Sequence, residues 1–457
     1  MTAHDLAQHA GNEPRTEYTS QISTYDAGPQ GMPIPPILQL FKLRRQQWLD
    51  FETLSELQQK KLTAIVNNAY HNVRFYRKVF DSEGIKPADI NSIEDMRRIP
   101  ITERQDLQVH PVGDITAESV DLQKCKKTLT SGSSGRPLTI YRTRPEDNLI
   151  DIVWARAFLE NGANIWDKNA DFHAFQSIPK RWFEHFGIWR RTTIPSLADP
   201  MKQIGMLKQA GPDVIRGNPC LLVNLVTIIQ RKGIEGIDPR LVFTMGNLLD
   251  QDSRALIESV LHTRVFDYYG TTELGCIAWE CSEHTGYHIN SDSVVIEVIN
   301  EKGEPARKGE RGKLICTGLL SYAMPFIRYN IGDVGILGAK SCPCGRGLPL
   351  LEHLEGRAFD FFVSADGTHH SPSLIHNQIK HVPGIQQYRV VQENETSVTA
   401  EIVPDKNLSQ KTSEELRRIM KRVLGDEAET RVEIVSEIPC DASGKMQAIV
   451  SKVKKGF

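Results

Sequence analysis

The chain has 457 residues, of which 40% are hydrophobic and 25% are charged, so its composition is that of an ordinary globular protein with a large core. Its formal net charge of −2 provides no positive field to recruit nucleic acid or an anionic membrane. No apolar run approaches the roughly 20 residues that span a bilayer, and the N-terminus lacks the apolar core of a signal peptide. We therefore expect a cytoplasmic protein with neither nucleic-acid nor membrane partners, in which eight cysteines do not make a disulfide framework.

The N-terminal third begins with a polar stretch, residues 1–30, which we interpret as a flexible tail. Prolines at positions 33, 35 and 36 predict an extended entry into the fold. A helix is predicted from Leu57 onward, because apolar residues then recur at helical spacing, at Leu62, Ile65, Val66, Ala69 and Val73.

A loop of small residues follows, with the sequence Thr130-Ser131-Gly132-Ser133-Ser134-Gly135-Arg136-Pro137. Its glycines allow backbone N–H groups to approach an anion closely, and its hydroxyls and Arg136 add donors and positive charge. The loop matches neither GxxxxGK[ST] nor GxGxxG, and Ser/Gly-rich segments are often plain linkers. Its interpretation as a phosphate-binding loop therefore depends on the motifs downstream.

Between about residues 140 and 350, helical stretches alternate with short β-rich runs such as 264–268 and 313–316. This alternation predicts an α/β fold. A second unit begins near Gly356, with a hairpin formed by residues 387–391 and 398–403.

The rest of this second unit contains one helix and one strand. Thr412 to Glu415 form a capping box that predicts the start of a helix, whose apolar face holds Leu416, Ile419, Met420 and Val423. A strand at 431–435 follows. We expect a large domain at 31–355 and a compact α+β domain at 356–457.

Four more motifs follow the Ser/Gly loop in chain order: Tyr268-Tyr269-Gly270-Thr271-Thr272-Glu273, Arg328-Tyr329-Asn330-Ile331-Gly332-Asp333, Glu355-Gly356-Arg357 and Ser443-Gly444-Lys445. Together they resemble the adenylate-forming enzymes, which include acyl- and aryl-CoA synthetases, luciferases and peptide-synthetase adenylation domains. The chain is most similar to the phenylacetate–CoA ligase branch and its CapK-like members, from about Leu57 to Val453. The resemblance implies a multi-layered N-terminal adenylation domain and a small C-terminal lid that rotates between two half-reactions.

Such enzymes solve the problem that a carboxylate is a poor electrophile. Attack on the α-phosphate of ATP gives an acyl-adenylate and pyrophosphate, and a thiol or amine can then attack the acyl carbon. Both steps need positioning and charge neutralisation.

The resemblance assigns roles to five residues of the Tyr268–Glu273 motif. It implies that Glu273 binds Mg²⁺, that Thr272 contacts the α-phosphate and that Tyr269 stacks on adenine, while Gly270 and Thr271 complete the ATP-binding turn. Without the resemblance, Glu273 would be an ordinary acidic residue at a helix N-terminus.

The remaining motifs each supply one residue. By resemblance, Asp333 accepts hydrogen bonds from the ribose hydroxyls, and Arg357 binds phosphate or ribose. Lys445 would neutralise charge on the reacting carboxylate and α-phosphate. The alternatives are a turn aspartate, a surface arginine and a solvated loop lysine.

Three sulfurs and one imidazole predict a structural zinc site, namely Cys281, His288, Cys342 and Cys344. Some members of the branch carry zinc on a Cys, Gly-x-His and Cys-x-Cys pattern that this chain matches. His284 and Cys276 compete for ligand positions. The alternative is that these are reduced residues without a metal.

Three positions depart from the resemblance. Arg136 stands where lysine is common, and Phe359 replaces the usual hinge aspartate, with Asp360 beside it. Asp366-Gly367 occupies a position where CoA-using relatives have Arg-Gly, and an acidic residue there does not favour anionic CoA. Adenylation is therefore better supported than transfer to CoA.

The leading hypothesis is an ATP-dependent ligase that activates a carboxylic acid and passes it to CoA. A carrier-protein thiol or an amine is the alternative acceptor, and a non-catalytic nucleotide-binding regulator or a zinc-organised interaction module is the alternative of another class. Abundant aromatic residues favour an aromatic acid. The candidate acyl pocket, whose members could equally be core residues, consists of His173, Phe175, Gly246 and Asn247. Homodimers are common in the branch.

Overall fold

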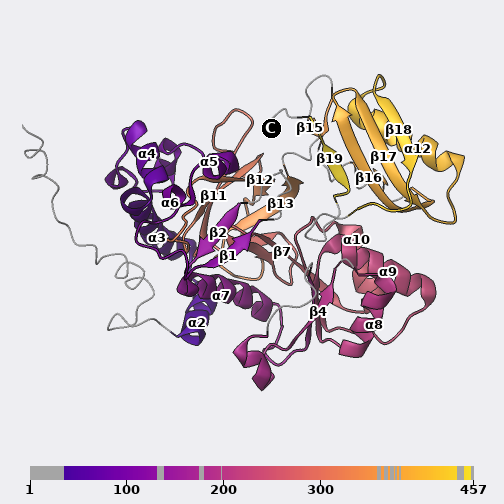
Figure 1. The fold of residues 1–457 in the computed structure, drawn as a ribbon, viewed down its shortest axis with the longest axis horizontal. Coiled ribbons are helices and arrows are strands. Elements are labelled where there is room, and N and C mark those ends of the chain that lie inside the picture. Colours follow the sequence, from indigo (N-terminus) through magenta and orange to yellow (C-terminus); the bar gives the residue numbers. More distant parts are fainter. Residues whose placement is uncertain are drawn as a thin grey trace, which may run out of the picture.

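The computed structural model describes residues 35–453 except for the stretches 131–137, 174–179, 197, 358–361, 365–368, 371–374, 376–377, 380–381 and 440–446. The expected tail at 1–30 lies outside the described residues. A large sheet of 11 strands and a separate sheet of four strands near the C-terminus dominate the fold (Figure 1). In the described part of the chain, no helix combines the length and the apolar character needed to cross a membrane.

One half of the large sheet is parallel. It consists of β4 (Arg191–Pro195), β3 (Asn169–His173), β5 (Val214–Gly217), β6 (Leu241–Met245) and β7 (Arg264–Thr271). Helices α8 (Pro200–Ala210), α9 (Pro219–Lys232) and α10 (Gln251–Leu261) connect these strands and pack on one face. On the other face lie α7 (Arg144–Glu160) and α2 (Pro36–Gln46). The predicted α/β alternation is confirmed.

The three connecting helices have well-defined N-termini for a local reason. Asp199, Asn218 and Asp250 each precede a helix, and each side chain accepts hydrogen bonds from backbone N–H groups of the first turn. Gly211 and Gly233 end α8 and α9 at φ values of +50° and +57°, which glycine adopts without strain. Each strand therefore enters its helix at a fixed point.

The other half of the large sheet is antiparallel. It contains β8 (Gly275–Glu280), β9 (Tyr287–Ile289), β13 (Leu350–Arg357), β12 (Tyr329–Leu337), β11 (Arg311–Gly318) and β10 (Val294–Ile299). Strand β7 is the point of reversal, because it pairs parallel with β6 and antiparallel with β8.

Helices from the N-terminal region cover this antiparallel half. They are α3 (Phe51–Asn72), α4 (Arg74–Ser82), η1 (Pro87–Asp89), η2 (Glu94–Arg98), α5 (Arg104–Val109) and α6 (Val112–Ile115). The predicted helix is confirmed, but it begins at Phe51, because Asp50 caps it by accepting from the Thr53 N–H at 2.8 Å. The expected extended entry is wrong at Pro36, which is the first residue of α2, a position where a missing N–H does no harm.

The C-terminal sheet has the order β18-β17-β16-β19 and its own hydrophobic core. Its elements, with a preceding two-stranded ribbon, are β14 (Phe362–Val363), β15 (His369–His370), β16 (Ile385–Asn394), β17 (Ser397–Pro404), α12 (Gln410–Leu424), β18 (Glu429–Ile434) and β19 (Ile449–Ser451). The predicted hairpin is confirmed as β16 and β17, and the strand predicted at 431–435 is confirmed as β18. The predicted helix start at Thr412 is wrong, because the helix begins at Gln410 and Ser409 is its N-cap. Thr412 already lies inside the helix, where its hydroxyl accepts a hydrogen bond from the Ser409 N–H at 3.3 Å.

A buried ion pair ties α7 to the antiparallel half of the sheet. Arg156 is fully buried and donates to Asp292 from both terminal nitrogens, with Nη2 and Oδ1 3.0 Å apart. Burial acts to raise the pKa of Asp292, but the charge and hydrogen bonds of Arg156 outweigh it and hold that pKa below its usual value. The arginine is thus the main group that favours the charged form of this buried aspartate.

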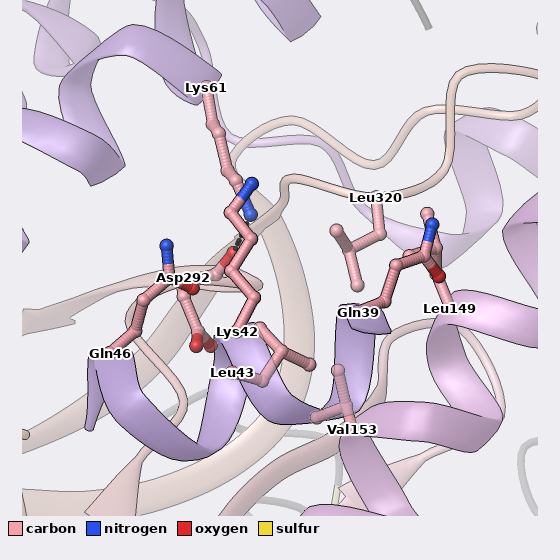
Figure 2. Close-up of a pocket in the computed structure, with 9 residues that line it drawn as sticks. All are labelled: Gln39, Lys42, Leu43, Gln46, Lys61, Leu149, Val153, Asp292 and Leu320. Carbon is pink, nitrogen blue, oxygen red and sulfur yellow. Dashed lines mark hydrogen bonds between the residues drawn. The ribbon is translucent and has the colours of Figure 1, made fainter. Parts of the chain in front are cut away.

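Asp292 also lines a small pocket next to α2 (Figure 2). Lys61 reaches the same residue from α3 and donates to its backbone carbonyl at 2.7 Å. The remaining walls come from α2, α7 and Leu320, and none of the residues predicted to bind ATP or the acid is among them. This pocket is therefore a feature of the packing around the ion pair and is not the candidate active site.

We predict that Arg156→Met lowers the free energy of unfolding by about 3–5 kcal/mol, because it leaves a buried carboxylate without its partner. Urea denaturation measures the loss. The matched control is Arg44→Met, which removes a half-exposed arginine paired with Glu160 and should cost less than about 1 kcal/mol. Equal losses in the two variants would contradict the prediction.

Candidate active site and metal centre

Several predicted site residues gather where the parallel strands end. His173 is the last residue of β3, Gly246 and Asn247 follow β6, and the Tyr-Gly-Thr-Thr-Glu motif ends β7. Ligands of open α/β sheets bind beyond the carboxyl ends of the strands. Asn247 there accepts a hydrogen bond from Asn218, the residue after β5. This edge of the sheet is therefore the candidate site, while the role of each acyl-pocket residue stays a prediction.

The turn after β7 depends on Gly270. A Cβ atom at this position would lie 2.4 Å from the Gly275 carbonyl oxygen and 2.9 Å from the Trp154 ring, so no other residue fits without rearrangement. Thr271 stabilises the turn by accepting from the Leu274 N–H at 3.1 Å. The Thr-Thr-Glu segment is consequently held at a fixed position at the end of the strand.

Glu273 is nearly buried and is paired with a cation. Its Oε1 accepts from Arg104 Nη2 at 2.6 Å and from the Tyr329 hydroxyl at 3.2 Å. Burial and the Glu273 charge raise the pKa of Tyr329, so this phenol stays a donor. Sequence reasoning missed Arg104, although a cation in the first turn of a helix, where the dipole disfavours it, is an available signal.

Asp333 comes from a different part of the sequence and meets the same motif. The Tyr269 hydroxyl donates to its Oδ2 at 2.6 Å, across 64 residues of chain. The register of β12 and β13 places the backbone of Arg357 opposite Asp333. Three of the predicted nucleotide-binding positions are therefore neighbours in the fold.

Arg142 connects the strand that follows the predicted phosphate-binding loop to the Glu273 motif. It lies on β2 (Thr139–Arg142), which pairs with β1 (Lys126–Leu129). Two hydrogen bonds close the base of the loop: the Leu138 N–H donates to the Thr130 hydroxyl at 2.9 Å, and the Thr130 N–H donates to the Leu138 carbonyl at 3.0 Å. Arg142 Nη2 donates to the Thr272 carbonyl and, at 3.0 Å, to the Glu273 carbonyl. Burial lowers the pKa of Arg142. Sequence reasoning also missed this residue, since no local pattern distinguishes it.

Other predicted residues cannot be located in the same way. Those outside the described residues are Ser131, Gly132, Ser133, Ser134, Gly135, Arg136, Phe175, Phe359, Asp360, Asp366, Gly367 and Lys445. Their assigned roles stay predictions.

The four predicted metal ligands lie together. One ligand atom from each of Cys281, His288, Cys342 and Cys344 falls within 4.8 Å of the others. Cys281 and Cys342 sulfurs are 3.6 Å apart, and Cys344 Sγ lies 3.3 Å from His288 Nε2. Tetrahedral Zn²⁺ with Zn–S bonds of about 2.3 Å needs sulfurs about 3.8 Å apart, so this set fits the ion.

The protonation state of His288 and the positions of the competing residues agree with that set. Burial lowers the pKa of His288 to about 4, so its ring is neutral and has a lone pair to offer a metal. The competitor Cys276 points to the Ala278 carbonyl at 3.9 Å, and His284 contacts Glu280 at 3.5 Å. Neither competitor belongs to the cluster.

Comparisons with known proteins show what the chain is similar to. The family model "CapK C-terminal domain" matches residues 362–452. The chain is 29% identical over 339 residues to phenylacetate-coenzyme A ligase of Escherichia coli, covering 72% of this chain and 76% of that one. It is 26% identical over 388 residues to phenylacetate-coenzyme A ligase of Thermus thermophilus, covering 82% and 85%.

A solved structure shows the same fold. The crystal structure of 2-hydroxyisobutyryl-CoA ligase, in the postadenylation state with R3-HIB-AMP, superposes with a TM-score of 0.75 at 19% identity and covers 89% of this chain and 91% of that one. The chain is therefore similar to phenylacetate-coenzyme A ligases over most of its length, its residues 362–452 match the CapK C-terminal domain, and its fold is that of an adenylate-forming CoA ligase.

Proposed function

We propose that this protein is an AMP-forming acid–thiol ligase. It activates a carboxylic acid with ATP as an acyl-adenylate, releases pyrophosphate and transfers the acyl group to CoA. The observation that carries the proposal is the convergence of Tyr269, Glu273 and Asp333 at the reversal point of the sheet, with the 2.6 Å contact between Tyr269 and Asp333. A purely structural role would not explain why these three polar residues meet at the carboxyl end of β7, the edge where ligands of α/β sheets bind.

The chain's own residues suit adenylate formation. Asp333, oriented by Tyr269, would accept the ribose hydroxyls, and Thr272, held by Arg142, would donate to the α-phosphate. Lys445 would neutralise the charge that develops between carboxylate and phosphate. Glu273 offers a buried carboxylate that would hold Mg²⁺, and the bound ion would neutralise phosphate charge. Hydrogen bonds hold Asp333 and the Thr272 backbone, so these two groups need no rearrangement at the moment of reaction.

The surroundings of Gly270 support one class of substrate. The half-buried Trp154 ring lies directly against this glycine and stacks on Phe158, with ring centroids 6.1 Å apart. An acyl group attached to the adenylate would meet this flat apolar surface, which supports an aromatic acid. The CoA-ligase relatives support CoA as acceptor, and a carrier-protein thiol or an amine is the alternative that Asp366 favours. We place the enzyme in the cytoplasm because the three cysteines of the proposed zinc site must stay reduced to bind a metal.

We predict carboxylate-dependent ATP–pyrophosphate exchange in the absence of CoA, highest with aromatic acids in a panel that also contains fatty acids and amino acids. Lys445→Ala should reduce exchange by about 100-fold or more, because it removes charge stabilisation specific to the transition state, and should leave the melting temperature unchanged.

The control is Lys452→Ala, which removes an exposed lysine of the same domain that pairs with Glu393. Undiminished exchange in Lys445→Ala would refute the role of the lysine. ATP binding without exchange for any acid would instead favour a non-catalytic regulator.

We also propose that Cys281, His288, Cys342 and Cys344 bind a structural Zn²⁺. Four protein ligands leave no open position for catalysis. The site joins the end of β8 and the middle of β9 to the loop before β13, and Arg346 on that loop donates to Gln47 and Glu160 at 3.0 Å each. The metal would therefore stabilise the contact between this loop and the C-terminal ends of α2 and α7.

We predict one zinc per chain by elemental analysis of metal-replete protein. Cys344→Ser should lose the metal and lower the melting temperature, with little change in the exchange rate at temperatures where the variant is folded. Cys220→Ser, which alters a half-buried cysteine on α9, should keep the zinc. Metal-replete wild-type protein without zinc would reject the site.

A further inference from the structure

The carboxylate that the metal would use already has a cation. Arg104 Nη2 lies 2.6 Å from Glu273 Oε1, and the two side chains are 23% and 6% exposed, so water screens the pair weakly. The Arg104 Nε also faces the Tyr329 hydroxyl at 3.3 Å. The arginine is thereby aligned on both groups that define this side of the site.

Arg104 is presented by backbone that docks firmly on the motif of β12. The Thr102 N–H donates to the Arg328 carbonyl at 2.9 Å, and the Asn330 N–H donates back to Thr102 at 3.0 Å, as in a short parallel strand pair. The Asn330 amide reaches the Glu103 carboxylate at 3.0 Å. Arg104 is therefore held near Glu273 by the fold and does not arrive there as a mobile surface side chain.

A metal and this guanidinium cannot use the carboxylate in the same way. Mg²⁺ binds oxygen at about 2.0–2.1 Å, so on the same oxygen it would stand within about 5 Å of the Arg104 nitrogen. Two positive charges at that distance in a nearly buried site repel each other strongly. Binding of the metal must therefore weaken or break the ion pair.

We propose that Arg104 is a positioning residue that stands in for the metal: it neutralises and orients Glu273 in the metal-free enzyme and is displaced when the cation binds. This inference rests on the proposed function, in which Glu273 is the metal ligand. Arg104 thereby holds the buried carboxylate in place, and it raises the metal concentration that the site requires.

The test uses terbium(III) as a hard, oxygen-seeking probe of the full-length protein without nucleotide. Tyrosine excitation should sensitise terbium bound at Glu273, because the Tyr329 hydroxyl lies 3.2 Å from that carboxylate. Arg104→Gln should bind terbium about tenfold more tightly than wild type or better, since the competing charge-assisted hydrogen bond is gone. Arg104→Lys, which keeps the charge, should stay closer to wild type.

The matched control is Arg98→Gln, which removes a half-exposed arginine of the same segment and should leave the affinity unchanged. Glu273→Gln should abolish the site. Unchanged or weaker binding in a folded Arg104→Gln, while Glu273→Gln loses binding, would overturn the role of Arg104 alone. Equal binding by Glu273→Gln and wild type would instead overturn Glu273 as the metal ligand, and with it the premise of the inference.

Discussion

The candidate site depends on one steric constraint, the absence of a side chain at Gly270. The chain must pass from the last parallel strand to the first antiparallel one while the Trp154 ring and the Gly275 carbonyl crowd the turn. Because the turn has one conformation, Thr272 and Glu273 are fixed relative to the sheet. Arg142 and Arg104 then reach this turn from two other segments, so the position of the whole site follows from the reversal of strand direction.

Electrostatics explains why these two arginines have different partners. Arg142 donates to carbonyl oxygens, so it fixes the backbone of the motif without neutralising a carboxylate that the reaction needs. Arg104 meets the carboxylate itself and provides the opposite charge that burial of Glu273 requires. The structural pair of Arg156 and Asp292 shows the same rule in the core, where no ligand competes for the aspartate.

Much of this arrangement could be predicted from the sequence, because its signals are local. The Tyr-Gly-Thr-Thr-Glu run, the cysteine spacings and the alternation of helices and strands are patterns within short windows. Arg104 and Arg142 could not be found in this way, because their contacts with the Glu273 motif span 169 and about 130 residues. The sequence predicts the wrong start for α12 because its local signal is ambiguous: Ser409 and Thr412 offer two overlapping capping patterns. The Thr412 hydroxyl donates to the Pro383 carbonyl, and this tertiary contact favours the earlier start.

The two proposed metals differ in chemistry, and the fold keeps them apart. Soft thiolates of the cluster would select Zn²⁺, whereas the single carboxylate of Glu273 suits a hard cation that also needs phosphate oxygens. The zinc would stabilise the segment between β8 and β9, whereas Glu273 belongs to the turn that follows β7. A closed four-ligand site would retain its ion, whereas a site with one protein ligand and a competing arginine would bind its ion weakly until substrate phosphates add oxygen ligands. The architecture therefore separates a metal that maintains the fold from one that would enter with each reaction cycle.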